Sequence, residues 1–317
     1  MSTFRPIALL LCILAMLCAS LRAQDKATGP TDTASTPVAS IPKGEVTIRS
    51  YHMEEAKKDI DYALYVPSSY DETRALPLVV LLHGLGSNPK QVIGYDGVVD
   101  EAEKRGYVVV APYGFNERGW YGSRGKGKEG PFFGNRKDPD NLGELSEKDV
   151  FNVLAIVEKD LRIDPTRRFL MGHSMGGAGS VYLGATRNGM WAGLAPLAPA
   201  FGGPMDLLEQ LGDTPVYVVM GDKDNLVPVA TVRQWVDEMK RLKTPVTYEE
   251  IAGGDHVRCI TQNEAMIGRV FDFFDAASER AKAKAKDAGD KKKAEQPAPK
   301  PGDGSSKGSG SVRDDKK

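Results

Sequence analysis

The sequence is poor in cysteine, has no excess of either charge and lacks repeated long apolar runs. Its 317 residues include 3 cysteines, and 42 Lys or Arg balance 43 Asp or Glu. So few cysteines exclude a disulfide-dense scaffold. The balanced charge argues against a chain built to bind nucleic acid along its whole length. Because only one apolar run stands out, near the amino terminus, a polytopic membrane protein is excluded as well.

Residues 1–23 are typical of a secretory signal. Arg5 precedes an apolar run over residues 7–17, and small residues follow up to Ala23, where we expect cleavage. The run is shorter than the roughly 20 residues of a membrane-spanning helix, so an uncleaved anchor is the weaker alternative. We expect a secreted or periplasmic protein with no stable membrane insertion after cleavage. Two of the three cysteines lie in this segment, and the third, Cys259, is expected to be a buried apolar side chain.

Low-complexity segments flank the part of the chain that can fold. Residues 24–43 are rich in Thr, Ser, Ala, Pro and Gly and predict a flexible linker. Residues 279–317 have almost no large apolar side chains and predict a disordered tail. This tail holds 12 basic and 7 acidic residues, whereas residues 24–278 hold 28 basic and 36 acidic ones. The neutral total therefore conceals an acidic folded domain, residues 44–278, which disfavours strongly anionic substrates.

Short apolar runs alternate with longer helical patterns across residues 44–278. Strands are expected at 63–66, 78–82, 107–111, 169–171 and 216–220, with weaker candidates at 194–197 and 246–251. Helical patterns cover 91–104, 146–161, 175–185, 231–242 and 263–277. Ser146 and Asp149 have capping-box spacing at the start of the second helix. The alternation predicts an α/β fold with a mostly parallel sheet, helices on both faces and no large cap domain.

The segment Gly172-His173-Ser174-Met175-Gly176 has the pattern G-x-S-x-G between an expected strand and an expected helix. A serine on so tight a turn needs small neighbours two residues away on either side, and the two glycines provide them. Ser174 is therefore the predicted nucleophile, and the N–H of Met175 is expected to face a developing oxyanion. The alternative is a glycine-rich turn with an idle serine.

Four histidines are available to activate Ser174. His256 lies on a loop after the last expected strand, where the order serine, acid, histidine places the base. His173 is too constrained by the nucleophile turn, and His52 precedes the expected sheet. His83 ends a strand and is expected to brace the following loop. A surface histidine with no role is the alternative for His256.

Two carboxylates compete for the role of the acid that orients His256. Asp222 and Asp224 both follow the strand at 216–220, and a triad acid must reach the far imidazole nitrogen from such a loop. Asp224 is favoured because it lies further out on the loop, while Asp222 is expected to cap or brace it. Asp255 is expected to be structural, because it adjoins the histidine and points away from it.

Two further segments complete the expected site. Gly84 and Gly86 free the backbone after the strand at 78–82, so the N–H of Leu85 is the expected second oxyanion donor. The long loop 114–143 is rich in glycine and aromatic residues and leaves the same edge of the sheet. Trp120 is its best candidate for substrate contact; a loop held by its own aromatic side chains is the alternative. Acidic residues at 138 and 140 hint only weakly at calcium, and we expect no metal.

These motifs together resemble those of the α/β-hydrolase superfamily. They look most like the secreted, cap-less esterases related to polyhydroxyalkanoate depolymerases and feruloyl esterases, and like prolyl-oligopeptidase catalytic domains. The resemblance implies an α/β-hydrolase fold, nucleophile, acid and base at Ser174, Asp224 and His256, and oxyanion amides at Leu85 and Met175.

Three hypotheses for the function follow. The leading one is a serine esterase that cleaves a small or polymer-linked carboxylic ester through an acyl-enzyme, without metal or cofactor. The second is a peptidase or amidase of the prolyl-oligopeptidase type, which would use the same machinery. The third is a hydrolase-fold binding protein without catalysis, which the presence of a complete set of candidate residues disfavours.

Overall fold

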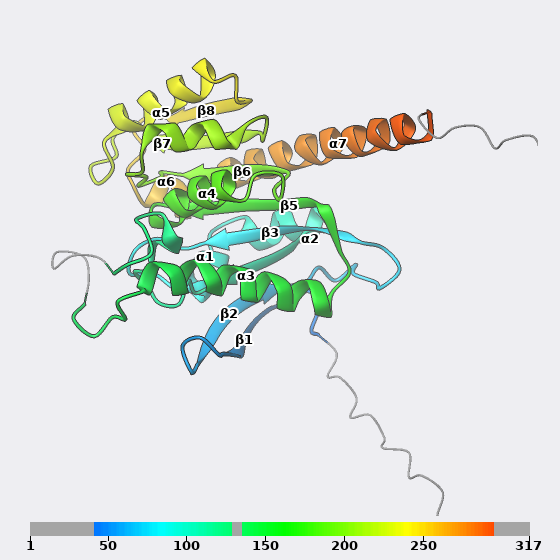
Figure 1. The fold of residues 1–317 in the computed structure, drawn as a ribbon, viewed down its shortest axis with the longest axis horizontal. Coiled ribbons are helices and arrows are strands. Elements are labelled where there is room, and N and C mark those ends of the chain that lie inside the picture. Colours follow the sequence, from blue (N-terminus) through cyan, green and yellow to red (C-terminus); the bar gives the residue numbers. More distant parts are fainter. Residues whose placement is uncertain (1–40, 129–134, 295–317) are drawn as a thin grey trace, which may run out of the picture. The chain divides into compact units, whose positions relative to one another are not determined.

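The computed structural model describes residues 41–128 and 135–294. Within them, eight strands form one sheet in the order β1-β2-β4-β3-β5-β6-β7-β8 (Figure 1). The strands are β1 Val46–Met53, β2 Lys58–Tyr65, β3 Leu76–Leu82, β4 Val108–Pro112, β5 Ile163–His173, β6 Gly193–Leu197, β7 Val216–Gly221 and β8 Val246–Ile251. β2 pairs antiparallel with β1 and β4, and every other pair is parallel. The signal segment, most of the linker and the last 23 residues lie outside the described residues.

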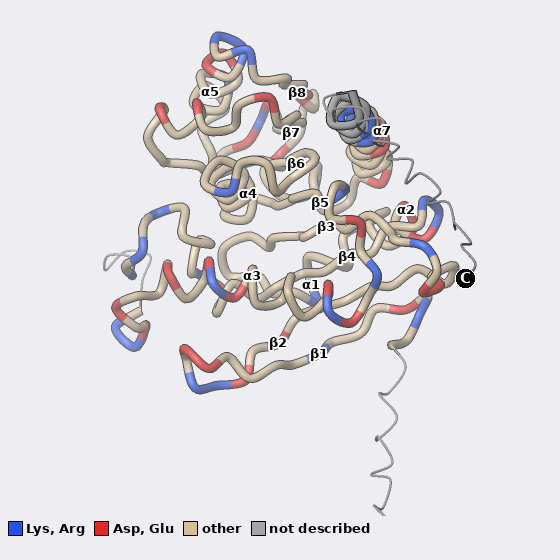
Figure 2. The backbone as a smooth tube through the Cα atoms, turned by 45° about the vertical axis from the view of Figure 1, so that its right-hand side comes forward, with Lys and Arg blue, Asp and Glu red and all other residues tan. Residues whose placement is uncertain are grey.

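Helices cover both faces of the sheet, which confirms the predicted architecture. They are α1 Pro89–Ile93, α2 Val98–Arg105, α3 Leu142–Asp160, α4 Met175–Thr186, α5 Val229–Arg241, α6 Arg258–Thr261 and α7 Glu264–Ala294, with 3-10 turns at Trp120–Gly122 and Met205–Leu211. The helices α3, α4 and α5 lie on one face, and α2 and α7 lie on the other (Figures 1 and 2). Charged residues gather on helices and loops, whereas β3, β6 and β7 carry none (Figure 2). Only a short connection joins β6 to β7, so no large cap is present there.

Two expectations about the amino-terminal half were wrong. His52 was expected to precede the sheet, but it lies in β1, an outer strand that alternates exposed and half-buried side chains. The single helix expected at 91–104 is two helices, because Gly97 adopts a left-handed φ of 86° between them. A Cβ on Gly97 would lie 2.9 Å from the side chain of Glu264, so the break lets α7 approach closely.

The tail is a third correction, because α7 continues as helix well past residue 279, where disorder was expected. Its first half buries large side chains at helical spacing: Met266, Ile267, Val270, Phe271 and Phe274. Beyond them the chain is dominated by Ala and Lys, which have high helix propensity. Lys282 pairs with Glu279 one turn earlier at 2.6 Å, and Lys284 pairs with Asp213 outside the helix.

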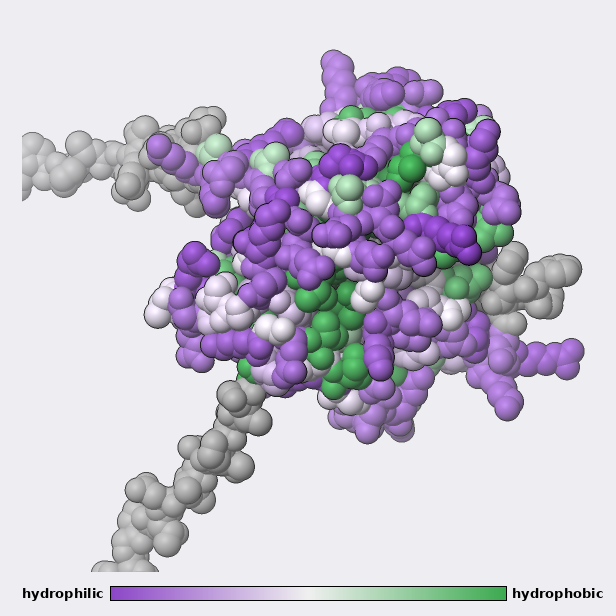
Figure 3. Space-filling model, turned by 180° about the vertical axis from the view of Figure 1, so that it is seen from behind, coloured by the Kyte–Doolittle hydropathy of each residue, from purple (hydrophilic) through white to green (hydrophobic). Residues whose placement is uncertain are grey.

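Exposed apolar side chains are few and local. The face opposite that of Figure 1 is mostly hydrophilic, with one apolar strip near its centre (Figure 3). Val46 and Ile48 on β1 are 38% and 48% exposed. The other large apolar side chains that the described residues expose belong to loops and a turn: Leu85, Met205, Leu226 and Val257. No helix in the described part of the chain is both long and apolar enough to span a membrane.

Candidate active site

Ser174 stands at the sharp turn between β5 and α4. Its backbone has φ 56° and ψ −113°, a conformation that L-residues rarely adopt. The turn tolerates no side chain at its two glycines, because a Cβ on Gly172 would strike the carbonyl of Gly176 and one on Gly176 would strike that of Leu82. Such a strained strand-to-helix turn is the conformation that G-x-S-x-G requires to present a serine hydroxyl above a sheet.

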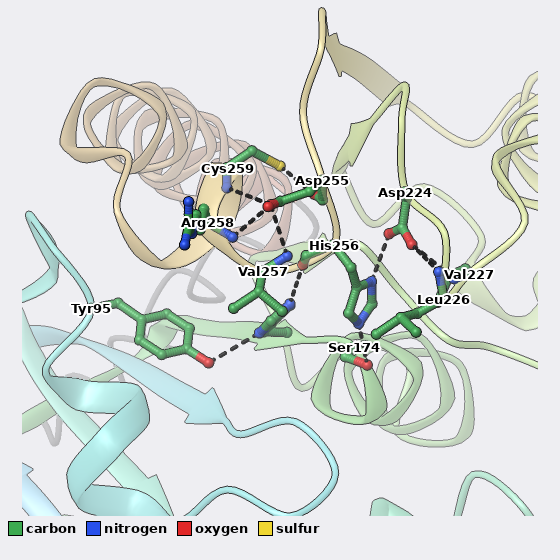
Figure 4. Close-up of polar contacts among 11 residues, drawn as sticks. Tyr95, Ser174, Asp224, Leu226, Val227, Asp255, His256, Val257, Arg258 and Cys259 are labelled. Carbon is green, nitrogen blue, oxygen red and sulfur yellow. Dashed lines mark hydrogen bonds and ion pairs between the residues drawn. The ribbon is translucent and has the colours of Figure 1, made fainter.

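Three side chains predicted from distant parts of the sequence meet in a line. Nε2 of His256 lies 2.9 Å from Oγ of Ser174, and Nδ1 lies 2.6 Å from Oδ2 of Asp224 (Figure 4). The side chain of Asp224 is fully buried, and that of His256 is 6% exposed. A buried carboxylate at this distance holds the imidazole so that Nδ1 carries the proton and Nε2 faces the hydroxyl.

The structure places Asp224, not Asp222, against His256. The second carboxylate oxygen of Asp224 accepts the N–H groups of Leu226 and Val227, each at 2.8 Å. Asp222 instead accepts the N–H of Gly253 at 2.7 Å and so braces its loop against the histidine loop. The brace was the expected role of Asp222.

Asp255 is structural, as expected from its position beside the histidine. One of its carboxylate oxygens accepts three successive N–H groups at the start of α6, from Val257, Arg258 and Cys259. The thiol of Cys259 donates to the carbonyl of Asp255 at 2.8 Å, and burial raises the pKa of this thiol to about 11. The thiol is half-buried rather than fully buried.

The loop after β3 lies against the nucleophile turn. A Cβ on Gly84 would be 3.5 Å from both Cβ of Ser174 and the carbonyl oxygen of His173. His83 is buried, with Nδ1 2.8 Å from the carbonyl of Gly84 and Nε2 2.9 Å from that of Tyr113, and burial lowers its pKa. These contacts brace the loop after β3, which lies against Ser174 at Gly84.

Asp149 and Ser146 have a role that the sequence analysis missed. Both lie within α3, which begins at Leu142, so they do not form the expected capping box. Ser146 accepts the N–H of Tyr121 at 3.0 Å. Asp149 accepts the N–H groups of Gly114 and Phe115 at 2.6 and 3.2 Å. The two side chains therefore anchor the loop that follows β4. The sequence pattern does not indicate this role, because both residues lie within a helix and not in the loop itself.

Trp120 is largely buried, 5% exposed, and the guanidinium of Arg124 lies 3.5 Å from the centre of its ring. Its indole N–H is buried without a hydrogen-bond partner among the described residues. Contact between Trp120 and a substrate stays a prediction.

The carboxylate of Asp138 accepts hydrogen bonds from the side chains of Asn116 and Arg118. Nowhere in residues 41–128 and 135–294 do three or more His, Cys, Asp or Glu side chains gather as metal ligands would.

Comparison with known proteins gives the family. Residues 53–266 match the family model "Esterase", described as "Putative esterase". The chain is 28% identical over 151 residues to S-formylglutathione hydrolase of Rattus norvegicus, covering 46% of this chain and 53% of that protein. It is 25% identical over 175 residues to "Probable feruloyl esterase C" of Aspergillus terreus, covering 53% of this chain and 56% of that protein. The chain thus spans about half the length of these curated relatives.

Solved structures share the fold. FphF, a fluorophosphonate-binding serine hydrolase of Staphylococcus aureus, superposes with a TM-score of 0.58 at 18% identity, covering 74% of this chain and 99% of that one. At this identity the likeness concerns the α/β-hydrolase fold alone. With more than half of its length matched by the family model, the chain belongs to the Esterase family.

Proposed function

We propose that the protein is a serine hydrolase that cleaves carboxylic esters through an acyl-enzyme. The observation that carries the proposal is the buried line from Asp224 through His256 to Ser174, with separations of 2.6 and 2.9 Å. Such a line makes a serine hydroxyl nucleophilic, because the oriented imidazole can take its proton. Membership of the Esterase family supports an ester as the substrate.

The reaction follows from this arrangement. Oγ of Ser174 attacks the ester carbonyl carbon while Nε2 of His256 takes the hydroxyl proton. The N–H groups of Leu85 and Met175 stabilise the oxyanion of the tetrahedral intermediate, a contribution of about 3 kcal/mol per donor. His256 then gives its proton to the departing alcohol oxygen, leaving the acyl group on Ser174. Water, deprotonated by His256, attacks the acyl carbon, and collapse releases the acid and restores the serine.

Apolar side chains support an apolar group in the substrate. Leu85 is 44% exposed on the oxyanion loop, Leu226 is 67% exposed two residues after the acid, and Val257 is 47% exposed next to the base. Each lies within two residues of a proposed catalytic group, and Figure 4 shows Leu226 and Val257 flanking the triad. These three side chains, the apolar rim, offer contacts to an alkyl or aryl part of an ester.

Export from the cytoplasm is a second part of the proposal. It rests on the composition of residues 1–23, with a basic start, an apolar run and small residues before Ala23. Amino-terminal sequencing of the protein recovered from its native host would test it. A mature chain beginning near residue 24 is expected, and an intact Met1 would contradict cleavage.

The activity is tested with purified wild type, Ser174→Ala and the control Ser50→Ala, which changes an exposed serine on β1. The substrates are p-nitrophenyl esters of increasing acyl length, methyl ferulate and a proline anilide. We expect ester turnover that is lost in Ser174→Ala and kept in Ser50→Ala. Absence of serine-dependent turnover would contradict the proposal, and faster turnover of the anilide than of any ester would favour a peptidase.

A further inference from the structure

The side chain of His173 makes a bridge between two other parts of the site. Its Nε2 lies 2.9 Å from the main-chain carbonyl oxygen of His256. Its Nδ1 lies 3.0 Å from the hydroxyl of Tyr95, which stands in the turn between α1 and α2 (Figure 4). The ring packs edge-on to Tyr95 and tilted by 37° against His256, with centroids 5.8 and 5.1 Å away.

The partners of His173 settle which ring nitrogen carries the proton. A carbonyl oxygen only accepts, so Nε2 must be the protonated nitrogen that donates to it. Nδ1 of the neutral ring then accepts, and the Tyr95 hydroxyl donates to it. Burial lowers the pKa of His173 to about 4 and raises that of Tyr95 to about 12, so both groups keep these forms at neutral pH.

The turn between α1 and α2 holds the segment after His256 at two further points. The N–H of Asp96 donates to the carbonyl of Thr261, at the end of α6, at 3.1 Å. Gly97 packs against Glu264, at the start of α7. The turn between α1 and α2 therefore contacts the chain from His256 to the start of α7 at three points. Of these, the contact through Tyr95 and His173 is the one that reaches His256 itself.

We propose that His173 is a positioning residue for the base: its Nε2–H fixes the main chain of His256, and the hydroxyl of Tyr95, which donates to Nδ1, holds the ring in place. The inference rests on the proposed function. Nε2 of His256 must stay 2.9 Å from Oγ of Ser174 while Nδ1 stays 2.6 Å from Oδ2 of Asp224, and this requires that the main chain of His256 is held in place. Misplacement of a reacting group by about 1 Å costs about 100-fold in rate. The hydrogen bond from His173 to the His256 carbonyl therefore affects turnover directly.

The experiment compares His173→Leu, His173→Gln and Tyr95→Phe with the matched control His52→Leu, which changes an exposed histidine on β1. We expect His173→Leu to lower kcat on p-nitrophenyl acetate by about 10- to 100-fold, with KM changed less than about 2-fold. His173→Gln keeps an N–H that reaches the carbonyl, so it should recover most of kcat. Tyr95→Phe should lower kcat by about 3- to 10-fold, since the ring of His173 loses the hydrogen bond that holds it in place.

A second readout separates positioning from general loss of structure. The rate at which a fluorophosphonate probe labels Ser174 depends on the serine and its base but little on ester binding. We expect labelling by His173→Leu to slow in parallel with kcat, while its circular dichroism spectrum stays close to that of His52→Leu. Equal kcat and labelling rates in His173→Leu and wild type would overturn the inference.

Two further outcomes are informative. If His173→Leu does not fold, Tyr95→Phe and His173→Gln decide: an unchanged kcat in Tyr95→Phe, or a kcat in His173→Gln that stays lost although the variant is folded, would overturn the inference. If wild type itself neither turns over esters nor labels at Ser174, the proposed function fails first and the inference with it.

Discussion

Gly221 and Gly254 cross so closely that a Cβ on Gly254 would lie 3.0 Å from Cα of Gly221. A Cβ on Gly221 would strike the carbonyl of Gly254, and that carbonyl accepts the N–H of Lys223 at 2.9 Å. The loop that carries Asp224 and the loop that carries His256 are therefore locked backbone against backbone. This contact sets the distance between the two side chains.

Gly221→Ala should force the two loops apart. We expect a loss of about 1–3 kcal/mol in the free energy of unfolding, which is typical of overpacking. We also expect kcat to fall by more than the decrease in the folded fraction would explain. Urea denaturation and p-nitrophenyl acetate turnover measure the two effects. Gly202→Ala is the matched control, because a Cβ there meets nothing within 4 Å. A kcat of Gly221→Ala equal to that of wild type would contradict the role of this backbone contact.

Asp224→Asn and Asp222→Asn should differ sharply. In Asp224→Asn the imidazole loses the carboxylate that fixes its tautomer, and we expect kcat to fall by about 1,000- to 10,000-fold. In Asp222→Asn the side-chain carbonyl still accepts the N–H of Gly253, so kcat should stay within about 3-fold of wild type. Steady-state kinetics of both variants decide, and an equal loss in the two would contradict the assignment of Asp224.

The sequence pattern predicted the positions of the site residues better than their contacts. The order Ser174, Asp224, His256 was predictable because a strand-to-helix turn, a strand end and a late loop each leave a local signature. The bridge from Tyr95 through His173 was not predictable, since it joins three segments that no motif connects. Their meeting depends on how α1 and α2 pack against the segment after His256.

Buried strands were predicted well, whereas the outermost strand β1 and the second half of α7 were missed. β3 is apolar at every position and was evident as a continuous run, as were β4 and β7. β1 was missed because its polar residues dilute the pattern of an outer strand. The extension of α7 was missed because disorder was inferred from the lack of large apolar side chains, whereas the helix propensity of Ala and Lys and the ion pairs of Lys282 and Lys284 sustain it.

Tyr121→Phe should destabilise the loop that follows β3. The Tyr121 hydroxyl accepts the N–H of His83 at 3.0 Å and faces its carbonyl oxygen at 3.3 Å, all in the buried core. Without the hydroxyl, the N–H of His83 is buried and unpaired, which costs about 1–3 kcal/mol. Chemical denaturation measures the loss, with Tyr248→Phe on β8 as the control, because the hydroxyl of this half-buried tyrosine donates to a side chain, that of Glu250, and not to the main chain. Equal stability of the two variants would contradict the role of Tyr121.

Asp149 should contribute to the free energy of unfolding in a way that decreases as pH rises. Burial raises the pKa of this carboxyl from 3.8 to about 6, although Tyr51 and the N–H groups of Gly114 and Phe115 oppose the shift. Between those values the folded state binds more protons than the unfolded state, so this group's contribution to stability falls as pH rises. The difference corresponds to about 3 kcal/mol.

The variant Asp149→Asn isolates this effect, because it removes the titration and leaves all other groups in place. We expect the free energy of unfolding of wild type, relative to that of Asp149→Asn, to increase as pH is lowered from about 7 to about 4. Urea denaturation at several pH values gives the difference. A constant difference across this range would show that Asp149 does not titrate there.

The apolar rim should discriminate between esters by the length of the acyl chain. Leu226→Ala and Val257→Ala remove exposed apolar surface but keep the main-chain N–H groups that Asp224 and Asp255 accept. A partly buried contact of this size contributes about 1 kcal/mol, or about 5-fold in kcat/KM. We expect that loss for p-nitrophenyl octanoate and little change for the acetate, whose acyl group is too short to reach the rim.

Ile48→Ala is the matched control for the rim, because Ile48 is comparably exposed but lies on β1. It should leave kcat/KM unchanged for both esters. If the rim variants lost activity equally on acetate and octanoate, the side chains would be acting on the geometry of the acid and base loops rather than on the substrate. If neither ester were affected, the acyl chain would bind elsewhere, and the loop that follows β4 would be the next segment to test.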